Sequence, residues 1–181
     1  MAFGLKCCMR LCALGNLKLE MTDFSRPKPL LLLAFLVVEG AKERRHVQEL
    51  FWSEASNRAL SLRVALSQLR QVSPDVILSE GQRLSTPLES DVGAFLQAVR
   101  GGNLKVARGL YAGAFLDGFS LPDWGVELEE WVLNTRDALA NQARAVSLQL
   151  AEREFAGGKL EVAVRLAEEA FRLAEIGRAH V

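Results

Sequence analysis

Residues 56–71 read Ser-Asn-Arg-Ala-Leu-Ser-Leu-Arg-Val-Ala-Leu-Ser-Gln-Leu-Arg-Gln, and the first half of the chain is organised around them. On a helix of about 3.6 residues per turn, one face is apolar and consists of Ala59, Leu62, Ala65, Leu66 and Leu69. The opposite face is largely polar and partly basic, with Asn57, Arg63, Val64, Ser67, Gln68 and Gln71. This pattern predicts an amphipathic helix, which by itself is typical of any surface helix. Its role therefore depends on the segments that precede and follow it.

The composition is that of an ordinary globular protein. The chain has 181 residues, of which 50% are hydrophobic and 24% charged, enough to bury a core in one large domain or two small ones. The net charge of zero argues against a strongly electrostatic nucleic-acid or membrane binder. The charge is uneven, because residues 1–90 hold 12 basic and 9 acidic residues and the remainder holds 10 and 13. The small basic excess lies on the half that contains residues 56–71.

The cysteines and the apolar segments predict a soluble, cytoplasmic protein. Cys7, Cys8 and Cys12 have no histidine or second cysteine pair nearby at a zinc-like spacing, so we expect free thiols and neither a metal nor a cofactor. The longest apolar run, residues 30–38, has nine residues, whereas a membrane-spanning helix needs about 20. Basic residues interrupt the N-terminus before a signal-peptide core is long enough. We therefore expect no membrane partner.

A short β unit and a buried helix are expected first. Residues 11–14 and 17–21 flank a Gly-Asn turn signal, which predicts a small antiparallel pair. Pro27 and Pro29 permit a helix that continues to Glu39 and ends at Gly40. This helix is apolar nearly all round, so we expect it in the core.

Helix-turn-helix and hairpin signals follow. A second helix, residues 43–52, and a short turn at 53–56 lead into the helix of residues 56–71. Beyond it, residues 76–78 and 83–85 are expected to pair around Gly81. Strands, three helices and a terminal hairpin in this order describe a winged helix, whose third helix enters the major groove. The sequence therefore predicts a protein that binds double-stranded DNA.

The expected DNA contacts fall into two groups. Base contacts are assigned to the outer face of the third helix, at Asn57, Arg63, Ser67, Gln68 and Gln71. In this group Arg63 suits guanine, and Gln68 or Asn57 suits adenine. Phosphate contacts are assigned to the surrounding arginines Arg44, Arg45, Arg70 and Arg83. The alternative for Arg83 is an ordinary solvated strand residue.

Helical periodicity dominates the second half. Helices are expected over residues 91–100, 104–111, 124–155 and 159–174, with an apolar loop at 113–123 whose last residue, Asp123, precedes the long helix. Small residues and leucines recur at helix-pair spacing in the last two helices, which suggests a tetratricopeptide-like hairpin. The expected fold class is mainly α with a small β component: an N-terminal winged helix-turn-helix followed by an all-α, tetratricopeptide-like domain.

Segments in both halves follow the order and spacing of a known family. They are Met9 to Gly15, Arg44 to Trp52, Ala59 to Arg70, Asp91 to Phe95, Gly113 to Asp123 and Glu129 to Trp131. Together they resemble bacterial transcription regulators of the SARP type, which join an OmpR-like winged helix to a helical bacterial transcriptional activator domain. The resemblance covers nearly all of residues 9–174. Gln68 departs from it, because a basic residue is expected at that position.

The resemblance implies a DNA-binding transcription regulator. Its helical domain would support a homodimer on DNA or contact the transcription machinery, such as RNA polymerase subunits. The expected domains are an N-terminal extension (1–8), a winged-helix DNA-binding domain (9–88), a truncated activator domain (89–174) and a non-native tail (175–181).

Catalysis is not expected. The sequence contains only two histidines, His46 and His180, and has neither a phosphate-binding glycine loop nor a nucleophile elbow. The alternative function is a protein-interaction adaptor, in which the tetratricopeptide-like helices act and the winged helix no longer binds DNA. The zero net charge and Gln68 motivate this alternative.

Overall fold

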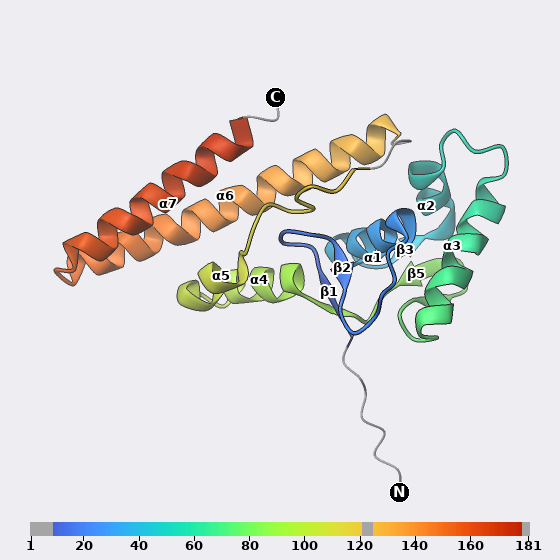
Figure 1. Ribbon diagram of the computed structural model, residues 1–181, viewed down its shortest axis with the longest axis horizontal. Helices are drawn as coiled ribbons and strands as arrows, with labels where there is room; N and C mark the ends of the chain where they lie inside the picture. The colour runs from blue at the N-terminus through green and yellow to red at the C-terminus, as the bar shows by residue number, and fades with distance from the viewer. Residues whose placement is uncertain (1–8, 121–124, 179–181) are drawn as a thin grey trace, which may run out of the picture.

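The computed structural model describes residues 9–120 and 125–178, and these residues form a mainly helical structure with small sheets (Figure 1). The predicted fold class is confirmed at the level of a mainly α protein with a small β component. The helices are α1 (Pro27–Glu39), α2 (Arg44–Phe51), α3 (Arg58–Val72), α4 (Asp91–Arg100), α5 (Leu104–Leu110), α6 (Val126–Ala156) and α7 (Leu160–Arg178). The strands are β1 (Arg10–Cys12), β2 (Lys18–Leu19), β3 (Lys42–Glu43), β4 (Leu78–Glu80), β5 (Arg83–Ser85) and β6 (Glu89–Ser90).

The first sheet has the strand order β2-β1-β6. β1 and β2 pair in antiparallel register with Leu11 opposite Leu19, so the predicted antiparallel unit is confirmed. Gly15 turns the chain with a φ of 106°, a conformation that favours glycine. β6, which pairs in parallel with β1, is not predicted from the sequence. A strand of two residues has no alternation to detect, and its partner lies far away along the chain.

The second sheet, β3-β5-β4, contains the predicted hairpin. β4 and β5 pair around Gly81, whose φ is 59°. β4 begins at Leu78 rather than at Val76, because pairing with β5 starts where Leu78 lies opposite Ser85, and the buried Val76 and Ile77 precede it. β3 is a further strand that the sequence does not predict, and it pairs with β5 just before α2 begins. β4 is therefore an edge strand.

α1 occupies the core as expected. Residues 29–36 are all buried, and α3 and α4 pack against this helix. Two prolines stand in its first turn, where the missing N–H groups cost nothing. Gly40, with a φ of 74°, ends the helix and donates its N–H to the Leu36 carbonyl at 3.0 Å.

α3 begins two residues later than the quoted stretch and ends at Val72. Most of the predicted apolar stripe is buried, namely Leu62, Ala65, Leu66 and Leu69. Ala59 is exposed, which corrects the prediction for this residue. It lies in the first turn of the helix, ahead of Leu62, the first α3 residue to reach the core.

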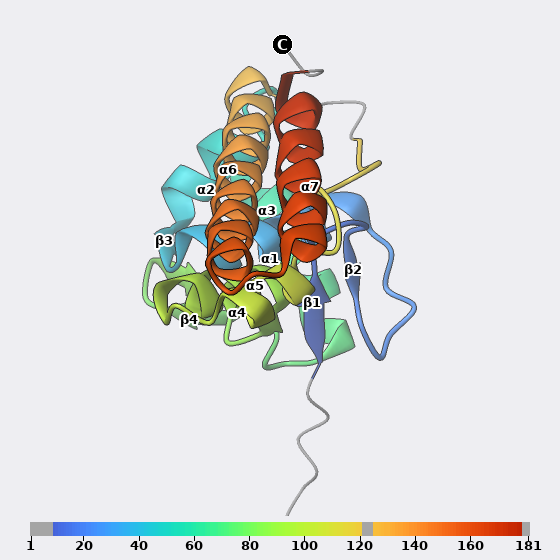
Figure 2. The ribbon, with the colours of Figure 1, turned by 90° about the vertical axis from the view of Figure 1, so that its left-hand side faces the viewer.

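α6 and α7 form a long antiparallel hairpin that turns at residues 157–158 (Figure 2). α7 continues to Arg178, so the predicted end at Ala174 is wrong. The added segment contains one glycine and no proline, and a single glycine costs only about 1 kcal/mol in a helix. α6 begins at Val126, and the start predicted just after Asp123 lies outside the described residues.

One hydrophobic core extends through both halves of the chain. The Trp131 ring of α6 packs edge-on against Phe35 of α1 and Phe115 of the loop after α5, with ring centroids 5.0 and 5.9 Å apart. Its indole Nε1 donates to Glu39 Oε1 at 2.9 Å. The long helix α6 is thus anchored on the element at the centre of the N-terminal half.

The carboxylate of Asp91, at the start of α4, also joins the two halves of the chain. We call this contact the junction. Asp91 is 8% exposed and accepts hydrogen bonds from the N–H groups of Ala13 and Leu14, both at 2.9 Å. It also accepts from the Val92 N–H at 2.8 Å. One side chain therefore satisfies backbone donors in the turn after β1 and in the first turn of α4.

Candidate nucleic-acid interface

α3 lies at one end of the molecule, far from the turn between α6 and α7 (Figure 1). Its outward stripe follows the spacing i, i+4, i+7 and i+11 and consists of the exposed residues Leu60, Val64, Ser67 and Gln71. Arg63, which is also exposed, lies beside this stripe on the side of Arg70. Three of the predicted base contacts, Arg63, Ser67 and Gln71, therefore share one accessible surface.

Two predicted phosphate contacts meet at Ser79 in β4. Arg70 donates from Nη2 to Ser79 Oγ at 2.8 Å, and Arg44 donates from Nη1 to the same oxygen at 3.5 Å. Arg44 is held beside the hairpin because its backbone N–H donates to the Gln82 carbonyl in the hairpin turn at 2.8 Å. Arg70 comes from the last turn of α3. Three elements thus bring two guanidinium groups together at the edge of the α3 surface.

The other two predicted phosphate contacts have acidic neighbours. Arg45 donates from Nε to Glu49 Oε1 at 2.9 Å, one turn along α2. Arg83 stands directly opposite Glu43 in β3 and Glu80 in β4. Opposite charges at such positions attract one another and offset the local positive potential. These two arginines therefore add less positive charge to the surface than Arg44 and Arg70.

Asn57 and Gln68 lie at the margins of the α3 surface. Asn57 is the N-cap of α3, and its Oδ1 accepts from the Leu60 N–H at 2.9 Å. The cap occupies the oxygen that paired recognition of adenine would need. Gln68 is half-buried and lines a shallow groove with Trp52 and with Leu60 and Val64 of the outward stripe. Both side chains are less available for base contacts than those of the outward stripe.

Electrostatics favours an anionic partner for this face. α3 contains three arginines, Arg58, Arg63 and Arg70, and no acidic residue. Within residues 9–120 and 125–178, neither Arg44, Arg63 nor Arg70 forms an ion pair with a carboxylate. Guanidinium groups without an internal counter-charge attract polyanions and match the geometry of phosphate and of the guanine edge.

Two residues of this surface escape the sequence-based prediction. Ser79 lies nine positions after Arg70, a spacing with no helical or strand meaning, and the contact forms because the loop after α3 folds back. Leu60 carries a detectable signal, since it precedes Val64 by four residues and therefore shares its helical face. It is 50% exposed, and Val64 is 48% exposed.

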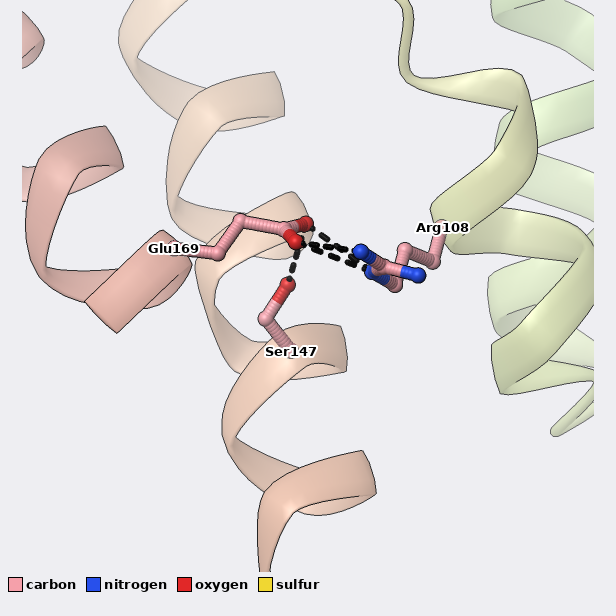
Figure 3. Close-up of polar contacts among 3 residues, drawn as sticks. All are labelled: Arg108, Ser147 and Glu169. Atoms are coloured by element: carbon pink, nitrogen blue, oxygen red, sulfur yellow. Dashed lines mark hydrogen bonds and ion pairs between the residues drawn. The ribbon is translucent and has the colours of Figure 1, made fainter. Parts of the chain in front are cut away.

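A separate polar cluster joins the helices of the C-terminal half (Figure 3). Arg108 of α5 donates to the Glu169 carboxylate of α7 from Nε, at 3.0 and 3.1 Å, and from Nη2, at 2.6 Å. Ser147 of α6 donates to Glu169 Oε1 at 3.2 Å. The Arg108 hydrogen bond is the main reason that the pKa of Glu169 lies below its ordinary value of 4.5. Arg108 and Ser147 are both bonded to Glu169, so the cluster links α5, α6 and α7.

The remaining candidate chemistry is limited in the part of the chain that the structure describes. It contains no group of three or more histidine, cysteine or acidic residues that could hold a metal ion. Burial, helped by a hydrogen bond with Glu20, raises the pKa of Cys12 to about 11, which keeps this thiol protonated and unreactive near neutrality. Cys7, Cys8 and His180 lie outside the described residues. None of the described helices combines the length and the apolar character needed to cross a membrane.

No protein-family model matches the chain, and no curated protein is significantly similar to it. The geometry and charge of the molecule's own surfaces therefore supply the structural observations that bear on function.

Proposed function

We propose that residues 9–88 form a winged helix that binds double-stranded DNA, with α3 in the major groove and the β4–β5 hairpin beside the phosphate backbone. This proposal rests on one observation: Arg44 and Arg70 both donate to Ser79 Oγ, at the edge of a helix, α3, that contains no acidic residue. When a helix lies in the major groove, phosphates flank it on both sides. Paired guanidinium groups at the edge of the helix suit that position.

The proposal gives each residue a role. Arg63 contacts guanine, Gln71 contacts adenine and Ser67 contacts either base. Arg44 and Arg70 bind phosphates, and Arg45 and Arg83 add weaker backbone attraction because of their acidic neighbours.

In this proposal the whole chain is a transcription regulator, and its helical half makes protein contacts. α4–α7 form a tetratricopeptide-like unit that supports a homodimer on DNA or contacts transcription machinery such as RNA polymerase subunits. The exposed rings of Phe155 and Phe171, 66% and 64% accessible, support a protein-binding role for this half. The resemblance to SARP-type regulators motivates the same assignment.

The test is a gel-shift titration of the full chain. The probe is duplex DNA taken from upstream of the genes that neighbour the gene for this protein. Arg63→Ala should weaken binding by about 1–3 kcal/mol, the usual cost of losing one bidentate base contact. The matched control is Arg165→Ala, an exposed arginine on α7 that should leave binding unchanged. Absence of binding at low salt, or equal effects of the two substitutions, would contradict the proposal.

The second candidate function is a protein-interaction adaptor without DNA binding. Exposed apolar side chains along the α6–α7 hairpin favour it, namely Leu148, Phe155, Leu160, Val164 and Phe171. The salt dependence of any DNA affinity separates the two functions. Several neutralised phosphates require a steep fall of affinity with salt, whereas a flat response favours the adaptor.

A further inference from the structure

The outward stripe of α3 begins with two apolar residues rather than with polar ones. Leu60 and Val64 are each about half exposed and lie one turn apart, in line with Ser67 and Gln71. Arg63 and Arg70 lie to one side of this line. Leu60 and Val64 also line the shallow groove beside Trp52 and Gln68, so if α3 enters the major groove they lie between that groove and the two arginines.

We propose that Leu60 and Val64 read the methyl groups of thymine, so that the preferred DNA target has A·T pairs opposite the first half of α3; this rests on the proposed DNA-binding function. The C5 methyl of thymine is the apolar group that base pairs present in the major groove. An aliphatic side chain removes that methyl from water and offers nothing to the donors and acceptors of a G·C pair. The chemistry thus discriminates by both attraction and mismatch.

The spacing of the stripe fits a short run of base pairs. At about 1.5 Å per residue, the rise from Leu60 to Gln71 is roughly 16 Å, comparable with about five base steps of 3.4 Å. Gln71 at the far end suits adenine through its amide. The two ends of the stripe therefore favour A·T pairs at different positions of the target, one through thymine and the other through adenine.

The charges around the apolar pair select DNA rather than a protein as the occupant. Every charged residue of α3 is an arginine. On α7, Leu160 and Val164 repeat the same pair at the same spacing, with similar exposures of 59% and 47%. Around that second pair the charges are mixed, with Glu161 and Glu168 beside Arg165, so its helix attracts a polyanion less than α3 does. The comparison supplies a matched control within one chain.

The experiment begins with selection of tightly bound duplexes from a library with a randomised centre, using the full chain. Each thymine of a selected site is then replaced by deoxyuridine, which removes the methyl and keeps the base-pairing. At one or two positions we expect affinity to fall about threefold to fivefold, the effect of one buried methyl-sized group. The Leu60→Ala/Val64→Ala variant should bind the thymine and uracil duplexes equally, whereas Leu160→Ala/Val164→Ala should retain the wild-type preference.

Three results would overturn the inference, and they are distinguishable. Binding by the wild-type chain that is insensitive to uracil at every position rejects thymine reading and leaves DNA binding intact. Absence of any DNA binding at low salt rejects the proposed function and the inference with it. A uracil effect that persists in the Leu60→Ala/Val64→Ala variant, together with a changed oligomeric state in sedimentation, assigns the apolar pair to a protein contact instead.

Discussion

α3 and α7 each expose a leucine and, four residues later, a valine, but the charges around these pairs differ. On α3 the charged neighbours are arginines alone, whereas α7 carries glutamates and arginines together. Glu169 of α7 is further tied to Arg108 of α5. Similar apolar patterns therefore belong to surfaces of different character, because one helix leaves its positive charge without a counter-charge and the other neutralises it within the protein.

α7 and α3 also differ in what they pack against. The buried residues of α6 include the small side chains Ala140, Ala143, Ser147 and Ala151, and Ser147 reaches Glu169 of α7. Ion pairs such as Lys159–Glu154, at 2.9 Å, add to the hairpin from outside. α3 instead rests on a core shared with α1, and its polar face contributes little to that packing. Substitutions on the two helices should therefore affect different properties.

The junction between the two regions should be the most sensitive point. Asp91→Ala leaves the backbone N–H groups of Ala13, Leu14 and Val92 without their buried acceptor, so we expect the free energy of unfolding to fall by about 3 kcal/mol or more. Chemical denaturation of the full chain measures it. Asp137→Ala, at an exposed position on α6, is the control and should change stability by less than about 0.5 kcal/mol. Equal losses would mean that the Asp91 carboxylate does not hold the junction.

The second largest effect should be on DNA binding, which we expect to weaken when arginines beside α3 are replaced but not when arginines of α6 and α7 are. Arg44→Ala combined with Arg70→Ala removes two proposed phosphate contacts, so we expect affinity to fall roughly tenfold or more and the slope of log affinity against log salt to fall by about 2. Fluorescence titrations at several salt concentrations measure both quantities. Arg144→Ala combined with Arg165→Ala removes the same charge from exposed positions on α6 and α7 and should leave the slope unchanged. The proposed contrast between the helices fails if the two double variants behave alike.

The Arg108 link should show the reverse behaviour, affecting stability but not DNA binding. Arg108→Ala removes two donors from Glu169, and we expect a loss of about 1 kcal/mol, modest because the Arg108 side chain is 48% exposed. Lys105→Ala is the comparison variant and should lower stability less, since Lys105 is 83% exposed and its ion pair with Glu154 is 4.0 Å long. If Arg108→Ala lowers the DNA affinity, then the helical half of the chain contributes directly to the DNA interface.

The smallest expected effect is a dependence of stability on pH. The pKa of Glu169 is lower in the folded chain than its ordinary value of 4.5, chiefly because Arg108 donates to the carboxylate. The resulting stabilisation is present above about pH 4.5 and is lost as the pH falls through the folded-state pKa. Thermal unfolding in buffers below about pH 4.5 should therefore show a larger loss of stability for the wild-type chain than for Arg108→Ala. Parallel curves would indicate that this pair does not contribute to the acid response.

Local signals explain why much of the architecture is predictable. α1 combines an apolar run with prolines at its start and Gly40 at its end, and all three features act within the helix itself. Gly81 likewise marks the bend of the β4–β5 hairpin. β3 and β6 escape prediction because each has two residues and owes its existence to a distant partner. The end of α7 is misplaced because one glycine is too weak a signal to stop a packed helix.

The sequence by itself determines the amphipathic pattern of α3 and its lack of acidic residues, because periodicity and composition are properties of a continuous segment. Only the tertiary structure decides which arginines matter most to the proposed interface. It brings Arg44 and Arg70 together at Ser79, and it sets Glu43 and Glu80 opposite Arg83. Hydrogen bonds form only within a few ångströms, and exposed charges are screened beyond about 10 Å. The contribution of a charged side chain therefore depends on neighbours that the fold supplies from elsewhere in the chain.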